Sequence, residues 1–413
     1  MDMQYDAMII GGGASGLIAA CALARKGRRV VLLEKQDRVG RKLLSTGNGR
    51  CNLTNLNAGA GDYHGSRQAA QAALRAWPPK KVMDWFGDLG IPCVADEAGR
   101  AYPMSRQAAS VLDALRLGCA EAGVEVRTGF RVKSLRRSGQ GFEAQSEDGE
   151  PVRAHCALVC TGGLAAPKLG ACGDGYRLLE SLGHKTTPRF AAIAALKTPP
   201  EPVRGLKGIR AEGEIALLSE GELLRAERGE VLFAESGVSG IAAMQLARCA
   251  NEALRAGRRC EARLNFAPDV TAGDLLRRRA AQLPRRSLED FLNGIVPKRL
   301  GQALVRAAGL PMGMATGELT AKQLNALAEV LGGWSLPVVG VQDFDQAQVT
   351  AGGASLKDFD IRRMQSLRAP GLFAAGEVLD VDGDCGGFNL QWAWSSALLA
   401  AEGIDERLSE RKA

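Results

Sequence analysis

The sequence predicts an α/β protein, in which a Rossmann-like, doubly wound sheet with a β-meander is interrupted by an inserted domain of β and helical parts. Three observations indicate this class. The chain opens with a strand, a glycine turn, a helix and a second strand; the middle third loses this rhythm; and the rhythm returns near the end. Because 413 residues exceed one ordinary domain of roughly 100 to 200 residues, more than one core is expected.

The opening βαβ unit begins with a strand at residues 7–10 and continues through a glycine turn at 11–16. Residues 17–26 carry apolar side chains at helical spacing, and Gly27 follows where a helix C-terminal glycine is typical. A second strand runs from 29 to 34. This order predicts the start of a parallel sheet.

The glycine turn matches G-x-G-x-x-G at Gly11, Gly13 and Gly16. In that pattern the first glycine permits a tight turn, the second lets the backbone approach a pyrophosphate, and the third lets helix and strand pack. Glu34 ends the second strand, where a carboxylate accepts hydrogen bonds from an adenosine ribose and disfavours NADP. An incidental tight turn is the alternative, but the strand, the helix and Glu34 together favour a dinucleotide.

The segments that follow differ in periodicity. A polar, glycine-rich loop spans 40–57, and helical patterns follow at 69–89 and 111–121. Short strand-like segments then come in quick succession, which predicts an antiparallel meander inserted in the main sheet. These segments lie at 124–126, 131–135, 141–145 and 152–160.

The character of the chain changes near Pro188. Residues 191 to about 265 alternate in short segments with turns such as Ser219-Glu220-Gly221, which predicts β structure. Residues about 266 to 345 carry helical patterns at 275–283, 287–294 and 320–331, and Ser287 with Asp290 suggests a capping box. We therefore expect a discontinuous domain, 1–190 with 346–413, and an insert domain, 191–345.

The C-terminal region bears on the choice between NAD and FAD. Residues 371–375 form a buried strand candidate, Phe388 to Ala401 form an amphipathic helix, and an acidic, glycine-rich loop lies between them. NAD binding would leave this region unexplained, whereas FAD is longer and needs a second anchor. In the FAD interpretation the loop faces the ribityl and phosphate groups, and the first amides of the helix face the flavin ring. The alternative is a loop that binds a cation.

Composition limits the classes of partner. The net charge of +7 comes from 53 basic and 46 acidic residues, and the basic cluster Arg277 to Arg279 lacks interleaved aromatics, so nucleic-acid binding is disfavoured. Ten cysteines without C-x-x-C or zinc-ligand spacing indicate a reducing compartment and no metal site. Without a signal-like segment or an apolar run of about 20 residues, a cytoplasmic protein with no membrane span is expected.

Several motifs resemble those of one family. The sequence is similar over nearly its whole length to the BaiN and RdsA type of NAD(P)/FAD-dependent oxidoreductases, also called YhiN-like flavoproteins. The resemblance is carried by GGGASG at the start, GRKLLSTGNGRCN from Gly40, GRAYP from Gly99, PKLGACGDGY from Pro167 and AGEVLDVDGDCGGFNLQWAW from Ala375. It implies an FAD domain built from both chain ends, an insert over the flavin face, and, by analogy with some members, reduction of conjugated double bonds in steroid-like enones.

The sequence departs from the family at Ala351. Family members commonly have Thr-Arg-Gly-Gly here, and Ala351 takes the place of the arginine, so a substrate contact by an arginine at this position is not expected. Cofactor binding is expected at the glycine turn, the end of the second strand, the loop after it, the loops following the meander, and the C-terminal loop. The residues are Gly11, Gly13, Ala14, Ser15, Gly16, Glu34, Lys35, Arg41, Lys42, Gly47, Asn48, Gly49, Asn52, Val132, Thr161, Gly162, Gly163, Asp174, Gly376, Glu377, Gly387, Asn389 and Leu390.

The sequence thus predicts an FAD-dependent oxidoreductase acting on a small organic substrate. No second glycine fingerprint is present, so NAD(P)H is expected only as a transient electron donor. An RNA-associated or RNA-modifying flavoprotein and a non-catalytic FAD-bound sensor stay open as alternatives. The sequence indicates neither the catalytic residues nor the oligomeric state.

Individual polar residues give weaker signals. Cys51 and Cys385 lie in loops expected to touch the flavin, but a free cysteine is usually a small buried hydrophobe. Arg100 and Tyr102 either line a substrate cavity or serve packing. The three histidines are expected to be structural.

Overall fold

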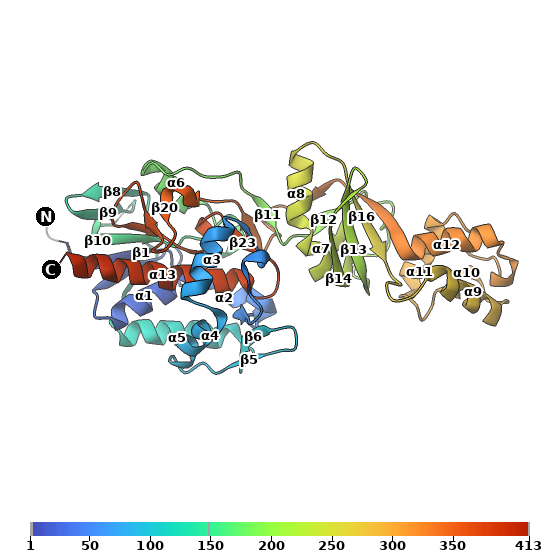
Figure 1. Ribbon diagram of the computed structural model, residues 1–413, viewed down its shortest axis with the longest axis horizontal. Coiled ribbons are helices and arrows are strands. Elements are labelled where there is room, and N and C mark those ends of the chain that lie inside the picture. Colours follow the sequence, from blue (N-terminus) through green and yellow to red (C-terminus); the bar gives the residue numbers. More distant parts are fainter. Residues whose placement is uncertain (1–2, 148, 412–413) are drawn as a thin grey trace. The chain divides into compact units, whose positions relative to one another are not determined.

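The computed structural model describes residues 3–147 and 149–411, and these divide into two compact units (Figure 1). Unit 1 combines the N-terminal segment up to Phe190 with the segment from Val349 onwards, and unit 2 comprises Ala191–Gln348. The structure thus puts the end of unit 2 between residues 348 and 349. The sequence analysis put it between residues 345 and 346.

The main sheet of unit 1 is mixed, with a central run of five parallel strands flanked by antiparallel ones. Its strands are β1 (Tyr5–Ile10), β2 (Val30–Leu33), β7 (Glu125–Arg127), β8 (Ser134–Ser138), β9 (Gly141–Gln145), β10 (Val152–Val159), β20 (Phe359–Asp360), β21 (Gln365–Ser366) and β22 (Leu372–Ala374). Numbered along the chain, the parallel strands β7, β2, β1, β10 and β22 stand in the order 3-2-1-4-5, the order of a dinucleotide-binding sheet. The predicted Rossmann-like fold class is confirmed.

The meander lies beside the parallel strands. β8, β9 and β10 pair antiparallel in succession. The first of these strands begins at Ser134, later than the expected residue 131, and Lys133 just before it donates its N–H to Gln145 O at 2.8 Å. Gly129 and Phe130 donate their backbone N–H groups to the carbonyl oxygens of Gln36 and Glu34, at 2.8 Å each.

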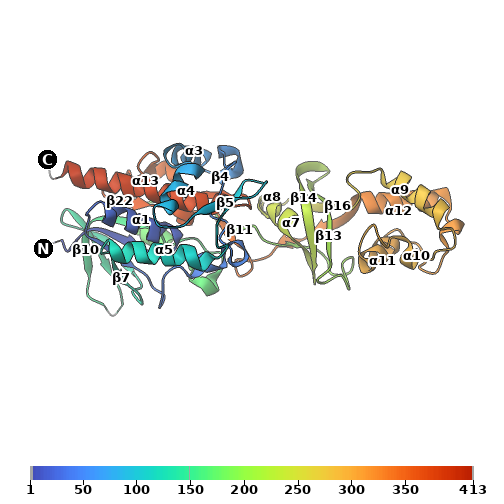
Figure 2. The ribbon, with the colours of Figure 1, turned by 90° about the horizontal axis from the view of Figure 1, so that it is seen from below.

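The helices of unit 1 are α1 (Ala14–Arg25), α2 (Arg41–Ser45), α3 (Arg67–Ala76), α4 (Pro79–Gly87), α5 (Ala108–Glu121), α6 (Asp174–Ser181) and α13 (Phe388–Glu410). The helical stretch expected at 69–89 consists of two helices, because Pro78 and Pro79 interrupt it and Pro79 takes the first position of α4, where its missing N–H costs nothing. α13 packs along α1, so the last helix of the chain lies beside the first (Figures 1 and 2).

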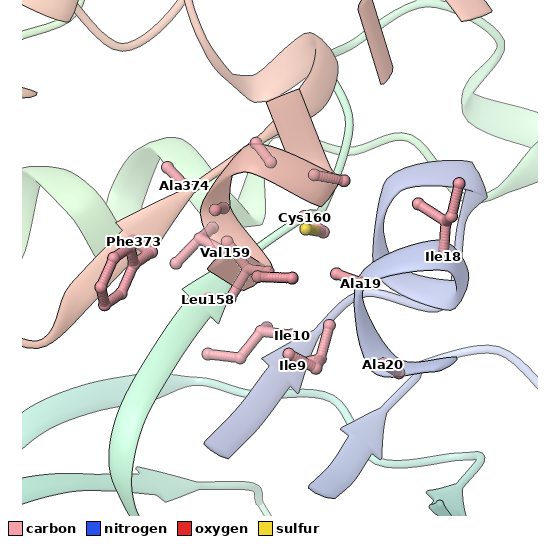
Figure 3. Close-up of a cluster of buried hydrophobic side chains, with 14 of the residues drawn as sticks. Ile9, Ile10, Ile18, Ala19, Ala20, Leu158, Val159, Cys160, Phe373 and Ala374 are labelled. Atoms are coloured by element: carbon pink, nitrogen blue, oxygen red, sulfur yellow. The ribbon is translucent and has the colours of Figure 1, made fainter. Parts of the chain in front are cut away.

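The core of unit 1 joins its two chain segments. Figure 3 shows Ile9 of β1, Ile18 of α1, Val159 of β10 and Phe373 of β22 in one cluster, and all four are almost fully buried. Parallel strands covered on both faces are expected to be continuously apolar, and Ala7 to Ile10 and Val30 to Leu33 have that composition. Burial of apolar side chains therefore holds β22, which comes from the C-terminal segment, in the main sheet.

Two small sheets connect distant loops of unit 1. β3 (Thr54–Asn55), β6 (Arg100–Pro103) and β5 (Cys93–Ala95) form one, and β23 (Val381–Gly383) pairs with β4 (Tyr63–Gly65) in the other. The second pairing fixes the acidic C-terminal loop against the N-terminal half of the chain. β11 (Phe190–Ala192) and β19 (Val349–Ala351) are the strands at which the chain leaves and re-enters unit 1.

Unit 2 contains a closed antiparallel sheet. Its strands are β12 (Leu196–Lys197), β13 (Arg210–Ser219), β14 (Glu222–Ala234), β15 (Gly237–Ser239), β16 (Cys260–Asn265), β17 (Trp334–Val338) and β18 (Gly340–Val341). The strand path begins at β17 and ends at β18. Because Val339 alone separates these two strands, they are halves of one bent strand, and the sheet closes into a barrel. The hairpin of β13 and β14 turns at Glu220 and Gly221, within the turn that the sequence predicted, and both residues have left-handed backbone.

The helices of unit 2 are α7 (Ile241–Gln245), α8 (Ala247–Arg255), α9 (Ala272–Gln282), α10 (Leu288–Phe291), α11 (Lys298–Ala307) and α12 (Ala321–Gly333). Of these, α9 to α12 lie together beyond the strands (Figure 2). The expected division into a β part and a helical part is only approximate, since α7 and α8 fall in the first and β17 and β18 in the second. Ser287 caps α10 without a side-chain hydrogen bond, whereas Thr320 Oγ1 accepts one from Gln323 N at 3.3 Å.

Candidate functional site

The glycine turn lies where the strand order of the sheet reverses, between β1 and β10. At such a switch point, ligands of doubly wound proteins bind beyond the carboxyl ends of the strands. A side chain on Gly11 would come within 2.5 Å of Cys160 O, and one on Gly16 within 1.9 Å of Gly11 O. Packing within the protein therefore requires these two glycines.

Gly13 differs from its neighbours in the turn. A Cβ atom there would have no atom within 4 Å among the described residues, and its φ of −81° suits any amino acid. Gly13 is also the N-cap of α1, which has no side-chain cap and no acidic residue in its first turn. The amides of Ala14 and Ser15 therefore lie at an uncapped helix start, an arrangement that binds anions. The open space at Gly13 fits a pyrophosphate.

Glu34 is held at the start of the turn. Its carboxylate accepts hydrogen bonds from Gly12 N at 2.7 Å and Gln36 N at 2.8 Å. Lys35, the next residue, lies 3.6 Å from Asp174 and beside the thiol of Cys172. The end of β2 and the start of α6 are thus brought together.

Asp174 is the centre of a charged cluster. Arg131 donates two hydrogen bonds to it, at 3.0 and 2.9 Å, and Arg177 and Cys172 also donate to its carboxylate. Burial by itself raises the pKa of Asp174, but these hydrogen bonds and the charge of Lys35 outweigh burial and hold the pKa well below its usual range. Val132 follows Arg131 and is buried. The structure therefore brings Lys35 and Asp174 together, and it buries Val132 next to Arg131 in the chain.

The loop after β2 has an unusual backbone. Gly47, Asn48, Gly49 and Cys51 all have positive φ, and for Asn48 and Cys51 this conformation costs on the order of 1 kcal/mol each. A Cβ atom on Gly49 would meet no described atom within 4 Å, whereas one on Gly47 would lie 2.8 Å from Asn52 N. Left-handed backbone at non-glycine residues is frequent in ligand-binding loops.

The C-terminal segment meets the glycine turn directly. A Cβ atom on Gly376 would lie 2.3 Å from Ser15 Oγ, so this backbone packs against the first turn of α1. Glu377 accepts hydrogen bonds from Lys42 Nζ at 2.7 Å and Thr350 N at 2.8 Å. Lys42 is thus paired with Glu377, while Arg41 donates to Gln36 Oε1 at 2.5 Å. Both chain ends therefore contribute to one site.

The loop after β10 completes this edge of the sheet. A Cβ atom on Gly163 would lie 2.4 Å from Thr350 Oγ1, and one on Gly175 1.9 Å from Thr161 Oγ1, so both glycines are needed for packing. Gly162 has a φ of +71° and, like Gly13, would place a Cβ atom where no described atom lies within 4 Å. Gly162 is a second open position at the carboxyl edge.

At the start of α13, the helix itself, the loop before it and the segment around Thr54 lie together. Gly387, its N-cap, has a φ of +101°, and a Cβ atom there would lie 2.5 Å from Thr54 O. The Asn389 side chain binds its own loop, accepting from Gly383 N at 2.8 Å and donating to Gly383 O at 2.7 Å. Leu390 is half-buried in the first turn. The Asn389 side chain thus shapes the loop, and no side-chain hydrogen bond caps the start of α13.

A buried polar network holds α13 in place. Gln391 donates to Trp77 O at 2.9 Å, and Thr54 donates to Gln391 Oε1. Asn52 Oδ1 is buried without a hydrogen-bond partner among the described residues, and it lies 2.8 Å from the position of a Cβ atom on Gly387. An orphaned polar atom beside an uncapped helix start is typical of a site that a ligand completes.

One of the three histidines has a carboxylate partner, since His64 Nε2 lies 2.9 Å from Asp384 Oδ1. Burial raises the pKa of Cys51 to about 12, so its thiol is protonated at neutral pH and unreactive. His184 stacks on Phe359, and burial lowers its pKa. Among residues 3–147 and 149–411, no group of three or more His, Cys, Asp or Glu side chains is placed to hold a metal.

Sequence reasoning singled out Tyr102 but missed the two arginines that lie over its ring. Arg100 is paired with Asp96 Oδ2 at 2.8 Å, whereas Tyr102 packs under two other arginines, Arg50 and Arg106. Tyr102 is 6% exposed and both arginines are exposed. The two arginines lie more than fifty positions apart in the chain, so no local motif unites them.

Comparison with known proteins places this geometry in a family. The model of the HI0933-like protein Rossmann domain matches residues 5–403. The 3-dehydro-bile acid delta(4,6)-reductase of Clostridium scindens is 35% identical, over 97% of this chain and 98% of that protein. The ribosomal RNA dihydrouridine synthase of Escherichia coli strain K12 is 30% identical, over 97% of this chain and 98% of that protein.

A solved structure shares the fold. It is the 3-ketosteroid delta1-dehydrogenase from Sterolibacterium denitrificans, in complex with 1,4-androstadiene-3,17-dione, with a TM-score of 0.54 and 14% identity over 98% of this chain and 99% of that one. No helix in the described part of the chain has the length and apolar character to cross a bilayer. The family resemblance read from the motifs is confirmed, and the chain belongs to the HI0933-like Rossmann family.

Proposed function

We propose that this protein is an FAD-dependent oxidoreductase that reduces a carbon–carbon double bond conjugated to a carbonyl group in a small organic molecule. The observation that carries the proposal is the meeting of the two chain ends, where the backbone of Gly376 packs on Ser15 at the uncapped start of α1. FAD needs both a pyrophosphate site and a second anchor, so it fits this arrangement better than NAD does. NAD(P)H is the proposed transient electron donor.

Different segments of the chain would bind different parts of FAD. Gly13 and the first amides of α1 would hold the pyrophosphate, and Glu34 the ribose. The left-handed loop around Asn48 and the first turn of α13 would hold the flavin end. When bound, FAD supplies a ring that accepts and donates hydride. The positive end of α13 would stabilise negative charge at the edge of that ring.

The substrate class is supported by the relatives. One is named a reductase of 3-dehydro-bile acids at positions 4 and 6, and the other a dihydrouridine synthase. Both names describe saturation of a double bond conjugated to a carbonyl group. We favour the small molecule because the bile-acid enzyme has the higher identity. We also propose a cytoplasmic location, because no disulfide joins any of the ten cysteines in the described part of the chain.

An RNA substrate is the second candidate. The dihydrouridine synthases named among the relatives act on ribosomal RNA, and α9 with the loop after it carries several arginines, including Arg278, Arg285 and Arg286. Filter binding to ribosomal RNA across a salt series separates the two candidates. Phosphate contacts require the affinity to fall steeply as salt rises, and the small-molecule proposal expects weak, non-specific binding.

The test of the proposal starts with the purified protein. The chromophore is released by denaturation and identified by mass, and the protein is then mixed anaerobically with NADH or NADPH and with a panel of enones. We expect FAD, bleaching by one of the two donors, and reoxidation by an enone. A colourless protein that does not bind added FAD would refute the proposal.

A further inference from the structure

Tyr102 is the centre of a cluster that the proposed function does not use. The guanidinium carbon of Arg50 lies 5.8 Å from the centre of the Tyr102 ring, and that of Arg106 lies 5.3 Å from it. Both distances are within cation–π range. The ring is buried and both arginines are exposed, so the ring holds two positive groups at the surface of unit 1.

These two charges are not neutralised by the protein. In the described part of the chain neither Arg50 nor Arg106 forms an ion pair, and the Arg50 side chain makes only a long hydrogen bond, from Nε to Gly47 O at 3.4 Å. The Tyr102 hydroxyl likewise has no hydrogen-bond partner among these residues. By contrast, nearby Arg100 is paired with Asp96. The cluster thus offers two guanidinium groups and a hydroxyl to a ligand.

The backbone positions both arginines in advance. Arg106 itself has a φ of +51°, and its N–H donates to Pro103 O at 2.8 Å, which closes a tight turn. Arg50 stands between Gly49 and Cys51, which are both left-handed. Left-handed backbone at a non-glycine residue costs on the order of 1 kcal/mol and occurs preferentially at ligand clamps.

The cluster is tied to the proposed flavin end by backbone hydrogen bonds. Ala101, next to Tyr102, accepts from Leu53 N at 2.8 Å and pairs with Thr54 in the β3–β6 ladder. The same loop reaches the start of α13, since Asn55 donates to Gly386 O at 3.0 Å. The strand that carries Tyr102 is therefore linked through β3 to the loop before α13.

We propose that Arg50, Arg106 and Tyr102 form a binding site for an oxyanion, either a carboxylate or a phosphate, carried by a molecule that reacts at this site. Guanidinium groups suit both anions because they present parallel N–H donors. The inference rests on the proposed function, and two sources share the chemistry: an acidic tail on the enone substrate, or the 2′-phosphate of NADPH.

The test uses FAD-loaded protein and isothermal titration calorimetry with two probe pairs. One pair is NADPH and NADH, and the other is a 3-oxo-4-ene steroid carboxylic acid and its neutral methyl ester. The variants are Arg50→Gln, Arg106→Gln, the double variant and Tyr102→Phe. Arg116→Gln is the matched control, because Arg116 is exposed on α5 and pairs only with Asp113 among the described residues.

Each arginine variant is expected to weaken one charged probe about 5- to 20-fold, with little change for its neutral partner and none in the control. Loss confined to the steroid acid assigns the site to the substrate, and loss confined to NADPH assigns it to the donor; either result supports the inference. FAD content and the melting temperature show that each variant is folded.

Two results would overturn the inference. One is a double variant that retains FAD and binds every probe like the unchanged protein, and the other is an unchanged, FAD-loaded protein that binds neither charged probe. Failure of the unchanged protein to bind FAD at all is a separate outcome, because it refutes the proposed function itself.

Discussion

Replacing Gly13 by alanine should separate folding from cofactor binding. The backbone at Gly13 is extended, with φ −81° and ψ −167°, and the new methyl group would meet no described atom within 4 Å. The apoprotein should therefore be as stable as the original or gain about 0.4 to 1 kcal/mol, from the reduced entropy of the unfolded chain. In a domain of this size that gain corresponds to a rise in melting temperature of roughly 1 to 3 °C.

FAD binding should respond in the opposite direction. If the pyrophosphate lies against Gly13, the methyl group overpacks the contact, which costs about 1 to 3 kcal/mol. FAD affinity should then fall about 5- to 150-fold, since 1.4 kcal/mol is a factor of ten. The assay is fluorescence titration of FAD into apoprotein, alongside thermal unfolding without cofactor.

Two further glycine variants serve as controls. Gly87→Ala, at the exposed end of α4, also adds a methyl group in open space and should leave FAD affinity unchanged. Gly16→Ala would place its Cβ atom 1.9 Å from Gly11 O and should lower the melting temperature of the apoprotein itself. The reasoning is refuted if Gly13→Ala binds FAD as tightly as the unchanged protein does.

Three other predictions concern single side chains. Glu34→Ala should weaken FAD retention at least tenfold in equilibrium dialysis, because the ribose loses its acceptor; unchanged occupancy would count against that contact. Cys51→Ala should leave the rate of flavin reduction unchanged within twofold in a stopped-flow assay, because burial raises the pKa of this thiol to about 12; a large loss would revive a redox role. Asp174→Asn should lower the melting temperature at neutral pH. Since folding depresses the pKa of Asp174, this deficit should persist above the pKa of free aspartate, about 4, and shrink at lower pH; a pH-independent deficit would contradict the ion-pair account.

The main sheet could be predicted because its signals are local. The order of residues predicts the first strand at Ala7 to Ile10, the glycine turn and the end of β2. The structure has all three, and the Glu34 carboxylate accepts a hydrogen bond from Gly12 N. The break between α3 and α4 has an equally local signal, because Pro78 and Pro79 stand where α4 begins.

Features that depend on distant contacts could not be read in the same way. α11 contains Gly301, which lowers helix propensity, but a Cβ atom there would lie 3.0 Å from Leu292 Cβ, so the glycine permits close packing of α10 and α11. β17 contains Pro337 and follows a helix directly, so only its pairing with β16 shows it to be a strand. The pairing of Arg50 and Arg106 around Tyr102 likewise depends on the β3–β6 ladder.

The position of α13 has a consequence for synthesis. As the chain emerges from the ribosome, α1 and its apolar residues appear first, but the helix that covers them is made last, after all of unit 2. Unit 2 can complete its local hairpins meanwhile, whereas the parallel sheet must wait for β22. Apolar surface of the nascent N-terminal segment therefore stays uncovered until the end of synthesis, which is a condition that favours aggregation and chaperone binding.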